Sequence, residues 1–519
     1  MSGRPSAQHH KQMSSVATHL LQREHAGALG HPGTSYAQLR ETHIGVVLLL
    51  GDRAYKFKKP VDIGFLDFTD RDRRAACCRR EVELNRRLAA DVYLGTGRLT
   101  DPDGMRSEPV VVMRRMPDDR RLSTLIAMGA DVEGTVVRLA RMLAAFHAGA
   151  DRSPAISAQG SADAVRARWS DCFRQVEQFQ PGGLHSVALA EIRDRALEFL
   201  AGRGALFERR IAQHRIVDGH GDLICDDIFC LDDGPRVLDC LEFDDDLRYL
   251  DGLDDIAFLA MDLEKLGEPE LAGVLLQRYA DFAGDPAPRA LRHHYVAYRA
   301  FVRVRVDCLR SAQGDPAAAA DARRCADLAL RHLRAGAVRM VLIGGPPGAG
   351  KSTIAGALAD AMGAALLSSD RIRKELHGLS PLQPAPQPYL CGVYDTADTA
   401  DTYREMITRA TGLVAHGESV VLDASWTDTA GRAAAAVTAK AGRAELVQVN
   451  CAAPAEVRLH RLRSRPPGPS DADAGIAQRM AAAAAPWPAA LTVSTIGTVQ
   501  DTVTGLLGHM MVRVQDGQQ

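Results

Sequence analysis

Apolar and polar residues alternate with two periods along the chain. Strand spacing runs from Thr42 to Lys59 around a Gly-Asp turn, and again over 108–116, with a charged amphipathic helix between them at about 70–90. Helical spacing then dominates, interrupted over 215–243 by a loop, a short strand, an Asp-Asp-Gly turn and a second strand, and it resumes from about 251 to 312. This order predicts a small sheet lobe joined to a larger helical lobe.

A different pattern starts at Val338, where strands and helices alternate after a Gly-rich loop. Such alternation predicts a parallel sheet with crossover helices. An Ala/Arg-rich helical stretch precedes it, and a Pro/Gly/Asp-rich stretch over 463–475 is typical of a mobile loop. We therefore expect four parts: a flexible segment (1–34), a first domain (35–312), a helical linker (313–337) and a second domain (338–512).

Composition narrows the class of protein. The chain has 519 residues, 46% of them hydrophobic and 25% charged, which is globular and large enough for about three domains. Its 63 Lys and Arg against 65 Asp and Glu give no bulk charge that would favour nucleic acid or membrane surfaces. No apolar run is long enough to span a bilayer, and the ten cysteines form no CxxC pair, so we expect a cytoplasmic protein with reduced cysteines.

The most specific motif is a P-loop between a buried strand and a helix, in the pattern G-x-x-x-x-G-K-[ST]. Backbone N–H groups of such a loop surround a phosphate, and the following helix N-terminus adds positive charge. Here Lys351 would reach the β- and γ-phosphates and the Ser352 hydroxyl would hold Mg²⁺. The loop comprises Gly345, Pro346, Pro347, Gly348, Ala349, Gly350, Lys351, Ser352 and Thr353.

Further candidates follow the P-loop. Asp423 ends an apolar strand and suits a magnesium carboxylate. Asp370 and Arg373 come after the second strand, where they would hold a substrate hydroxyl and a phosphate or acidic group. Arg461 and Arg465 precede the 463–475 loop; they suit either a closing lid that stabilises phosphoryl charge or a solvated helix face.

Residues 338–510 resemble the small-molecule kinase branch of P-loop proteins, such as gluconate kinase, polynucleotide kinase and zeta-toxin-type kinases. The resemblance lies in the P-loop, the SSDRIRK segment and the DAS segment after the apolar strand. It implies phosphoryl transfer and leaves the acceptor open.

A second constellation surrounds His220-Gly221-Asp222-Leu223. Protein kinases carry H-R-D-L-x-x-x-N, with the Asp as base and the Asn on magnesium. In that spacing Asp222 is the base and Asp227 replaces the Asn, keeping an oxygen ligand and adding a charge. H-G-D in place of H-R-D resembles the aminoglycoside-phosphotransferase-like kinases. That resemblance implies a further metal-binding acid at the end of the hairpin that follows, where Asp239 and Glu242 would point to opposite faces of a strand. Register arguments favour Glu242, with Asp239 as the alternative.

Upstream residues supply the remaining parts of this site. Lys56 and Lys58 share a strand face, and Lys56, flanked by two aromatics, is the preferred phosphate-binding lysine. Glu81 on the next helix is its expected partner, with Glu83 as the alternative. Met113 to Met116 is the expected hinge where an adenine would pair with the backbone.

Residues 35–312 resemble the aminoglycoside-phosphotransferase-like kinases, and the whole chain resembles proteins that fuse such a domain to an ATP-binding P-loop domain. YKFKKPVDIGFLDF, HGDL, CLEF and GGPPGAGKS carry the resemblance. It implies an α+β protein-kinase-like, two-lobed N-terminal domain followed by an α/β P-loop NTPase domain with a parallel sheet.

The function implied is phosphoryl transfer from ATP, with Mg²⁺, to hydroxyls of small molecules at two nucleotide sites, and no nucleic-acid or membrane partner. Asp227 in place of Asn supports an alternative, in which the first half is a nucleotide-sensing pseudokinase that regulates a P-loop kinase or ATPase. Antibiotic resistance is disfavoured, because no acidic cleft stands out beyond residues 244–246.

Overall fold

The computed structural model describes residues 36–41, 45–61, 67–101, 103–105, 107–179, 186–383, 390–464, 466 and 468–516. Two compact units divide the chain: one combines Met1–Gln159 with His214–Asp285, and the other combines Gly160–Gln213 with Pro286–Gln519. Each unit therefore combines two separate stretches of the chain. The domain boundaries predicted above divide the chain into consecutive stretches, and they stay a prediction. The expected flexible segment 1–34 lies outside the described residues.

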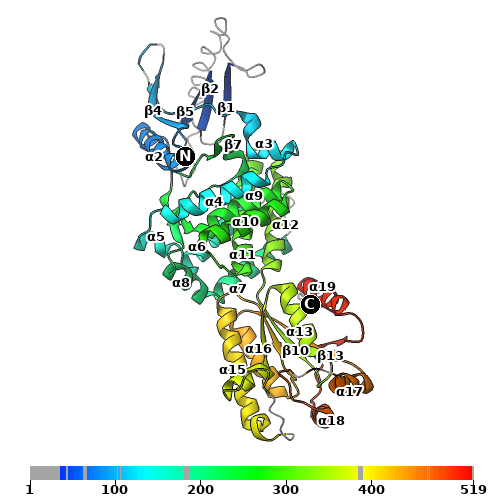
Figure 1. Cartoon of the computed structure of the whole chain (residues 1–519). Helices are drawn as coiled ribbons and strands as arrows, with labels where there is room; N and C mark the ends of the chain where they lie inside the picture. Colours follow the sequence, from blue (N-terminus) through cyan, green and yellow to red (C-terminus); the bar gives the residue numbers. More distant parts are fainter. Residues whose placement is uncertain are drawn as a thin grey trace. The chain divides into compact units, whose positions relative to one another are not determined.

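The first unit begins with a five-stranded antiparallel sheet in the order β1-β2-β3-β5-β4. Its strands are β1 (Ala37–Glu41), β2 (Gly45–Leu50), β3 (Arg53–Lys58), β4 (Tyr93–Thr100) and β5 (Ser107–Arg114). Helix α2 (Arg71–Ala89) is capped by the Asp70 carboxylate and packs on β4 and β5 (Figure 1). Cys78 and Val82 of α2 share a core with Leu49 and Val111, so this helix covers one face of the sheet.

The rest of the first unit is mainly helical and contains the predicted hairpin. Strands β7 (Ile228–Leu231) and β8 (Gly234–Val237) pair antiparallel around the Asp-Asp turn. A second small pair, β6 (Ile216–Asp218) with β9 (Tyr249–Asp251), brackets the HGD segment. The helices are η1 (Asp118–Arg120), α3 (Leu122–Ala127), α4 (Glu133–Gly149), α5 (Pro154–Ala158), η2 (Cys225–Asp227), η3 (Asp245–Leu247), α9 (Gly252–Lys265) and α10 (Pro269–Ala283).

Five helices of the second unit form their own layer. These are α6 (Ala162–Phe179), α7 (Ser186–Ala201), α8 (Gly204–Ala212), α11 (Arg289–Ala312) and α12 (Ala318–Ala335). Trp169 of α6 is buried against Phe173, Tyr298 and Phe301. Helix α12 occupies most of the predicted linker, and it buries Ala322, Cys325 and Ala329 while packing on α11 and α7.

The second unit also holds an all-parallel sheet in the order β11-β12-β10-β13-β14, as the alternation from Val338 predicted. Helices α13 and α19 cover one face, and α15 and α16 lie on the other side in Figure 1. The strands are β10 (Arg339–Gly344), β11 (Ala365–Ser368), β12 (Val420–Asp423), β13 (Glu445–Ala452) and β14 (Leu491–Ser494). The helices are α13 (Lys351–Met362), α14 (Ser369–Leu376), η4 (Gly392–Tyr394), α15 (Thr396–Ala415), α16 (Thr429–Ala441), α17 (Ala455–Ser464), α18 (Ala474–Ala483) and α19 (Val499–Asp516).

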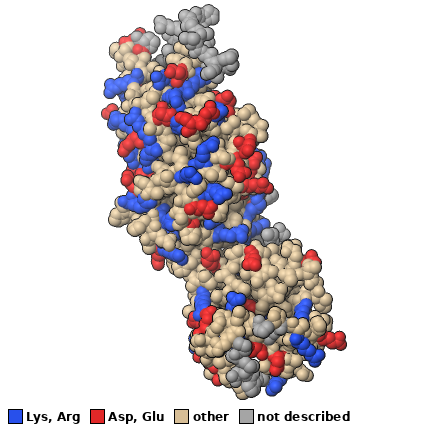
Figure 2. Space-filling view, viewed as in Figure 1, with Lys and Arg blue, Asp and Glu red and all other residues tan. Residues whose placement is uncertain are grey.

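The charged side chains and the cysteines are distributed as the composition suggests. Figure 2 shows basic and acidic side chains interspersed on the face in view. All ten cysteines are free thiols and nine of them are buried; Cys391 is exposed. Within the described residues, no helix combines the length and apolar character that a membrane crossing requires.

Candidate functional site

Two lysines of β3 and one glutamate of α2 form the centre of the first site. Lys56 Nζ lies 2.9 Å from Glu81 Oε1, and Lys58 Nζ lies 2.6 Å from Glu81 Oε2. Both lysines therefore lie on the strand face that α2 covers, as predicted from their spacing. Glu81 is fully buried, whereas Glu83 is exposed and pairs with Arg80. Of the two glutamates considered from the sequence, the structure brings Glu81 to the lysines.

Each lysine also contacts one of the two competing acids: Lys56 pairs with Asp239 and Lys58 pairs with Glu242. The expectation that these acids point to opposite faces of a strand is wrong. Strand β8 ends at Val237, and Asp239 adopts a left-handed φ of 65°, so the period of two no longer applies beyond the hairpin. Both acids consequently reach the same group of basic side chains.

Of the two competing acids, Asp239 lies near the expected metal-binding residue Asp227. Burial, followed by the charges of Asp239 and Asp222, raises the pKa of Asp227 well above its usual value. These three carboxylates are therefore close enough to repel one another. Glu242 is buried instead between Lys58 and Cys77, whose Sγ donates to Glu242 Oε1 over 3.5 Å.

Charge pairing compensates the burial of this cluster. Burial opposes ionisation of Glu81, but Lys56 and Lys58 keep the pKa of Glu81 below its usual value. Burial likewise opposes the charge of Lys56, but Asp239, Glu81 and Glu242 hold the pKa of Lys56 well above its usual value. Lys56 therefore keeps its positive charge, which the phosphate-binding role expected from the sequence requires.

Asp255, at the start of α9, holds the HGD loop, and the sequence analysis missed it. Its carboxylate accepts from the backbone N–H of His220 at 2.7 Å and of Gly221 at 2.9 Å. His147 approaches the same carboxylate at 3.0 Å. His220 Nε2 lies 3.1 Å from the Leu238 carbonyl, next to Asp239. These contacts fix Asp222 relative to the hairpin; the only signal in the sequence is an acidic pair at the start of an apolar helix.

The expected hinge residues lie in the core beside this cluster. Met113, near the end of β5, and Met116 are both buried. Their core cluster also contains Phe229 and Leu238, which come from the β7–β8 hairpin. The sheet and the hairpin thus meet at these methionines.

The P-loop of the second unit has the backbone that its glycines predict. Gly345, Gly348 and Gly350 have φ angles of 128°, 79° and 87°, a region that favours glycine. A Cβ on Gly348 would lie 2.6 Å from the carbonyl oxygen of Arg458, and one on Gly345 would lie 2.5 Å from that of Cys451. The loop can therefore follow this path only with glycine at these positions, and it leads directly into α13.

Polar side chains of the P-loop meet the end of β12. Strands β10 and β12 are in register at Ile343 and Asp423, and Ser352 hydrogen-bonds to the Asp423 carboxylate. Burial raises the pKa of Asp423, while Lys351 and the Ser352 hydrogen bond act against that shift. Lys351 Nζ meanwhile donates to the Pro346 carbonyl at 3.2 Å. A hydroxyl beside a carboxylate is an oxygen donor set that suits Mg²⁺ together with phosphate oxygens.

Asp370 and Arg373 follow β11 in α14, where the sequence placed them. The charge of Asp370 acts on both Asp423 and Tyr394, so Asp370 lies near the P-loop acid. Arg373 is buried; it donates to the Val393 carbonyl at 2.9 Å and to Thr399 Oγ1 at 3.2 Å. Arg373 therefore anchors the 393–399 segment beside Asp370.

Arg461 contacts the P-loop from α17. Its guanidinium donates to Thr495 Oγ1 at 3.1 Å and to the Thr495 carbonyl at 2.7 Å, and Thr495 Oγ1 donates to the Ala349 carbonyl at 2.7 Å. Arg461 thus supports the loop through Thr495. Arg465 lies outside the described residues.

A further contact, which the sequence analysis missed, joins α14 to the predicted mobile loop. Lys374 Nζ lies 3.2 Å from Asp471 Oδ2, and the Tyr394 hydroxyl donates to the same oxygen at 2.7 Å. Lys374 is almost fully buried, so this lysine and Asp471 form a shielded ion pair. The segment around Asp471 is thereby fastened beside Asp370 and Arg373.

Among the described residues, no group of three or more His, Cys, Asp or Glu side chains is arranged to enclose a metal ion. Both sites instead place one or two carboxylates beside a lysine. This fits an Mg²⁺ ion that takes its remaining ligands from phosphates and water.

Comparisons with known proteins cover both parts of the chain. Residues 340–487 match the family model described as an AAA domain. Uncharacterized protein Rv2004c of Mycobacterium tuberculosis and Mb2027c of Mycobacterium bovis are each 43% identical over 475 residues, which is 91% of this chain and 95% of theirs.

Two solved structures are similar to portions of the chain. A choline/ethanolamine kinase family protein from Mesorhizobium loti covers 63% of this chain and 99% of its own, with 15% identity and a TM-score of 0.38. A gluconokinase from Sinorhizobium meliloti covers 34% of this chain and 94% of its own, with 17% identity and a TM-score of 0.26.

Proposed function

We propose that this chain, which belongs to the family of the mycobacterial proteins Rv2004c and Mb2027c, is an ATP-dependent phosphotransferase, because two separate sites combine a basic phosphate-binding group with carboxylates. It has two nucleotide sites and transfers the γ-phosphoryl group to hydroxyls of small molecules. The observation that carries the proposal is the pair of arrangements Lys56–Glu81 beside Asp227 and Asp239, and Lys351–Ser352 beside Asp423.

In the first site, Asp222 orients the acceptor hydroxyl and takes its proton as the oxygen attacks phosphorus. Lys56, held by Glu81, binds the α- and β-phosphates. Asp227 and Asp239 hold Mg²⁺, which would neutralise the charge that develops on the phosphate oxygens. We favour Asp239 over Glu242 for this role, because Asp239 lies near Asp227, whereas Glu242 is buried against Lys58.

In the second site, backbone N–H groups of residues 345–353 surround the phosphates and Lys351 reaches the β- and γ-phosphates. Ser352 and Asp423 hold the metal ion. Asp370 positions the acceptor hydroxyl from α14, and Arg373 and Arg461 keep the neighbouring segments in place. Catalysis at both sites consists of positioning and charge stabilisation without a covalent intermediate.

A second candidate function rests on Asp227 and on the ion pair between Lys56 and Asp239. If the first site binds nucleotide without transferring phosphate, it regulates the P-loop site as a pseudokinase. An Asp in place of the magnesium-binding Asn adds a buried charge whose pKa is raised by burial and by its carboxylate neighbours. The surroundings of Asp227 therefore oppose its ionisation, and a bound cation would offset that effect.

ATP turnover in Lys351→Ala, Asp222→Asn and the double variant distinguishes the two functions. With two catalytic sites, each single change removes part of the turnover and the double variant removes nearly all of it. Complete loss in Lys351→Ala with full activity in Asp222→Asn would instead support the pseudokinase. Full activity in the double variant would contradict both.

A further inference from the structure

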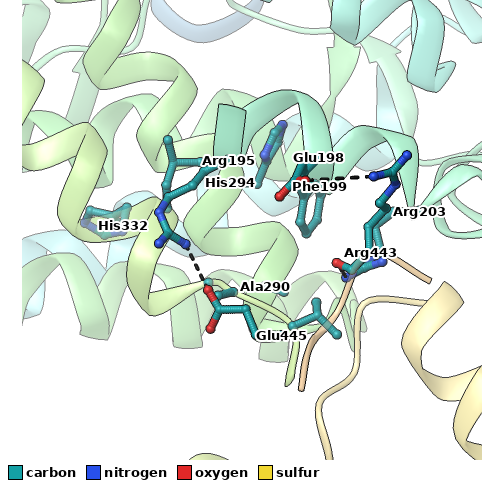
Figure 3. Close-up of a pocket in the computed structure, with 13 residues that line it drawn as sticks. Arg195, Glu198, Phe199, Arg203, Ala290, His294, His332, Arg443 and Glu445 are labelled. Carbon is teal, nitrogen blue, oxygen red and sulfur yellow. Dashed lines mark hydrogen bonds and ion pairs between the residues drawn. The ribbon is translucent and has the colours of Figure 1, made fainter. Parts of the chain in front are cut away.

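A cavity of about 50 Å³ lies within the second unit (Figure 3). Its walls come from α7, α11, α12 and the chain entering β10 and β13, and its polar or aromatic lining includes Arg195, Glu198, Phe199, Arg203, His294 and Arg443. The cavity sits at the amino ends of β10 and β13, whereas the P-loop follows the carboxyl end of β10. Six residues of β10 separate the two ends, about 20 Å at the rise of an extended strand.

Arg203 carries an uncompensated charge in this wall. It is 1% exposed, and its guanidinium donates only to backbone carbonyls: those of Gly202 at 2.9 Å and Arg443 at 3.2 Å, and that of Gly442. No carboxylate of the described residues pairs with Arg203, and burial lowers its pKa to about 10. A buried guanidinium without an anion is unusual, because burying an unpaired charge is costly.

Part of the Arg203 guanidinium also has no hydrogen-bond partner. Nη1 and Nη2 serve the successive carbonyls of Gly442 and Arg443, and Nε has no hydrogen-bond partner. The Arg203 guanidinium has five N–H donors and meets three carbonyl acceptors, so two of its donors have no partner. One of these two is the Nε–H. An Nε–H together with an Nη–H is the edge on which arginine binds a carboxylate or phosphate in bidentate fashion.

His294 adds a second unpartnered donor. The Trp169 indole, which can only donate, approaches His294 Nε2 at 3.2 Å, so Nε2 accepts and the proton of the neutral ring is on Nδ1. Burial lowers the pKa of His294 to about 3, which keeps the ring neutral, and Nδ1 has no partner. The Phe199 ring stacks on His294 at 4.4 Å and faces the Arg203 guanidinium at 5.6 Å, so these side chains form one wall.

The carboxylates that line the cavity do not satisfy this wall. Glu445 lies 3.0 Å from Arg195, and Glu198 lies 3.9 Å from Arg443 (Figure 3). The cavity lining thus contains three arginines and two glutamates. Arg195 and Arg443 each pair with one glutamate, and Arg203 is the lining arginine that pairs with neither. The volume accommodates about three to five water-sized groups, since one water requires roughly 10–15 Å³. That is the size of a single carboxylate or phosphate group.

We propose that this cavity binds a small oxyanion, a carboxylate or phosphate group carried by a metabolite, with Arg203 as its counter-ion and His294 as a further donor. The site is independent of the two nucleotide sites. Its ligand would contact α7, α11 and the turn that enters β13. The two segments already approach closely there, because a Cβ on Gly202 would lie 2.6 Å from the Gly442 carbonyl oxygen.

Hydrogen–deuterium exchange of the full chain tests the proposal with inorganic phosphate in one arm and acetate in the other, at constant ionic strength set with chloride. We expect saturable protection of peptides covering 195–203 and 442–445 with at least one anion, and the effective arm identifies the ligand class. Protection of 345–353 by phosphate reports the P-loop separately. An absence of protection at 195–203 and 442–445 with both anions would overturn the proposal, whatever happens at the P-loop.

Arg203→Lys keeps the charge but removes the planar fork, so the apparent affinity at 195–203 should fall about tenfold or more. Arg209→Lys changes an exposed arginine of α8 outside the cavity and should leave the affinity unchanged. Should Arg203→Lys not fold, Arg443→Gly removes the cation from an exposed residue whose φ of 49° suits glycine, and should weaken binding about two- to fivefold. Unchanged affinity in the tested cavity variant would contradict the proposal.

Discussion

Single side chains distinguish the two acids that compete for the metal-binding role proposed at the first site. Lys58 holds Glu242 in a buried ion pair, and the left-handed backbone of Asp239 turns that carboxylate toward Lys56 and Asp227. Spacing from Asp222 could not reveal this, because a period-of-two argument requires a strand and β8 ends before both acids. Lys56 and Glu81 could be predicted, because strand and helix periods hold where those residues lie.

We predict that Asp239→Asn raises the Mg²⁺ concentration needed for turnover at the first site by about 100-fold or more, because the ion loses one of its charged oxygen ligands. Measurements in a Lys351→Ala background isolate this site. Glu242→Gln is the matched control: it should lower the melting temperature, since Lys58 loses one of two buried partners, and leave the Mg²⁺ requirement nearly unchanged. The reverse result would return the metal role to Glu242.

Burial of His294 makes stability depend on pH. Its folded pKa of about 3 is below the ordinary value of about 6.5, so between these values the unfolded chain binds a proton that the folded chain does not. Stability should therefore fall as pH falls from about 6.5 to 3, by up to about 1.4 kcal/mol per pH unit from this residue.

His294→Gln removes the titration and keeps both an acceptor for Trp169 and a donor. Denaturation of the variant between pH 7 and 4.5 should show a shallower pH dependence of stability than the parent chain. An identical slope in both proteins would contradict the assignment of His294 as a buried neutral ring.

Among the elements, the P-loop was the most predictable, because its function requires a backbone that only glycine tolerates. Sequence pattern also located β2, β3, β5, α2 and the β7–β8 hairpin. It missed β1, β4, β6 and β9, which are short or weakly alternating, such as YLGTGRLT with two glycines. The helical linker over 313–337 stays a prediction, and its Ala/Arg-rich sequence gives no sign of the partners that the small buried face of α12 contacts.

Gly348→Ala tests the P-loop geometry. A Cβ would lie 2.6 Å from the backbone of Arg458 at a φ of 79°, so the loop must shift and the N–H groups lose their common orientation. We expect nucleotide affinity at the second site to fall at least about 100-fold, which calorimetry in an Asp222→Asn background measures. Gly356→Ala, at an open position inside α13, should bind normally and melt slightly higher. Normal binding by Gly348→Ala would contradict the loop assignment.

At the scale of the whole molecule, sequence and structure agree on two folds. They differ on how the helices are divided between the two units. The antiparallel sheet with α2 and the parallel sheet with the P-loop each follow from local periodicity. The grouping of 160–213 with residues after 286 does not, because it depends on side chains far apart in sequence, such as Trp169 and His294. The cavity at Arg203 arises from the same grouping.

The central proposal is that one chain holds two nucleotide sites. Equilibrium dialysis with a non-hydrolysable ATP analogue and Mg²⁺ counts them directly. We predict two analogue molecules per wild-type chain, one in Lys351→Ala and one in Lys56→Met, with binding abolished in the double variant. One molecule per wild-type chain, lost completely in Lys351→Ala, would contradict the claim that the lysine–carboxylate cluster of the first unit binds nucleotide.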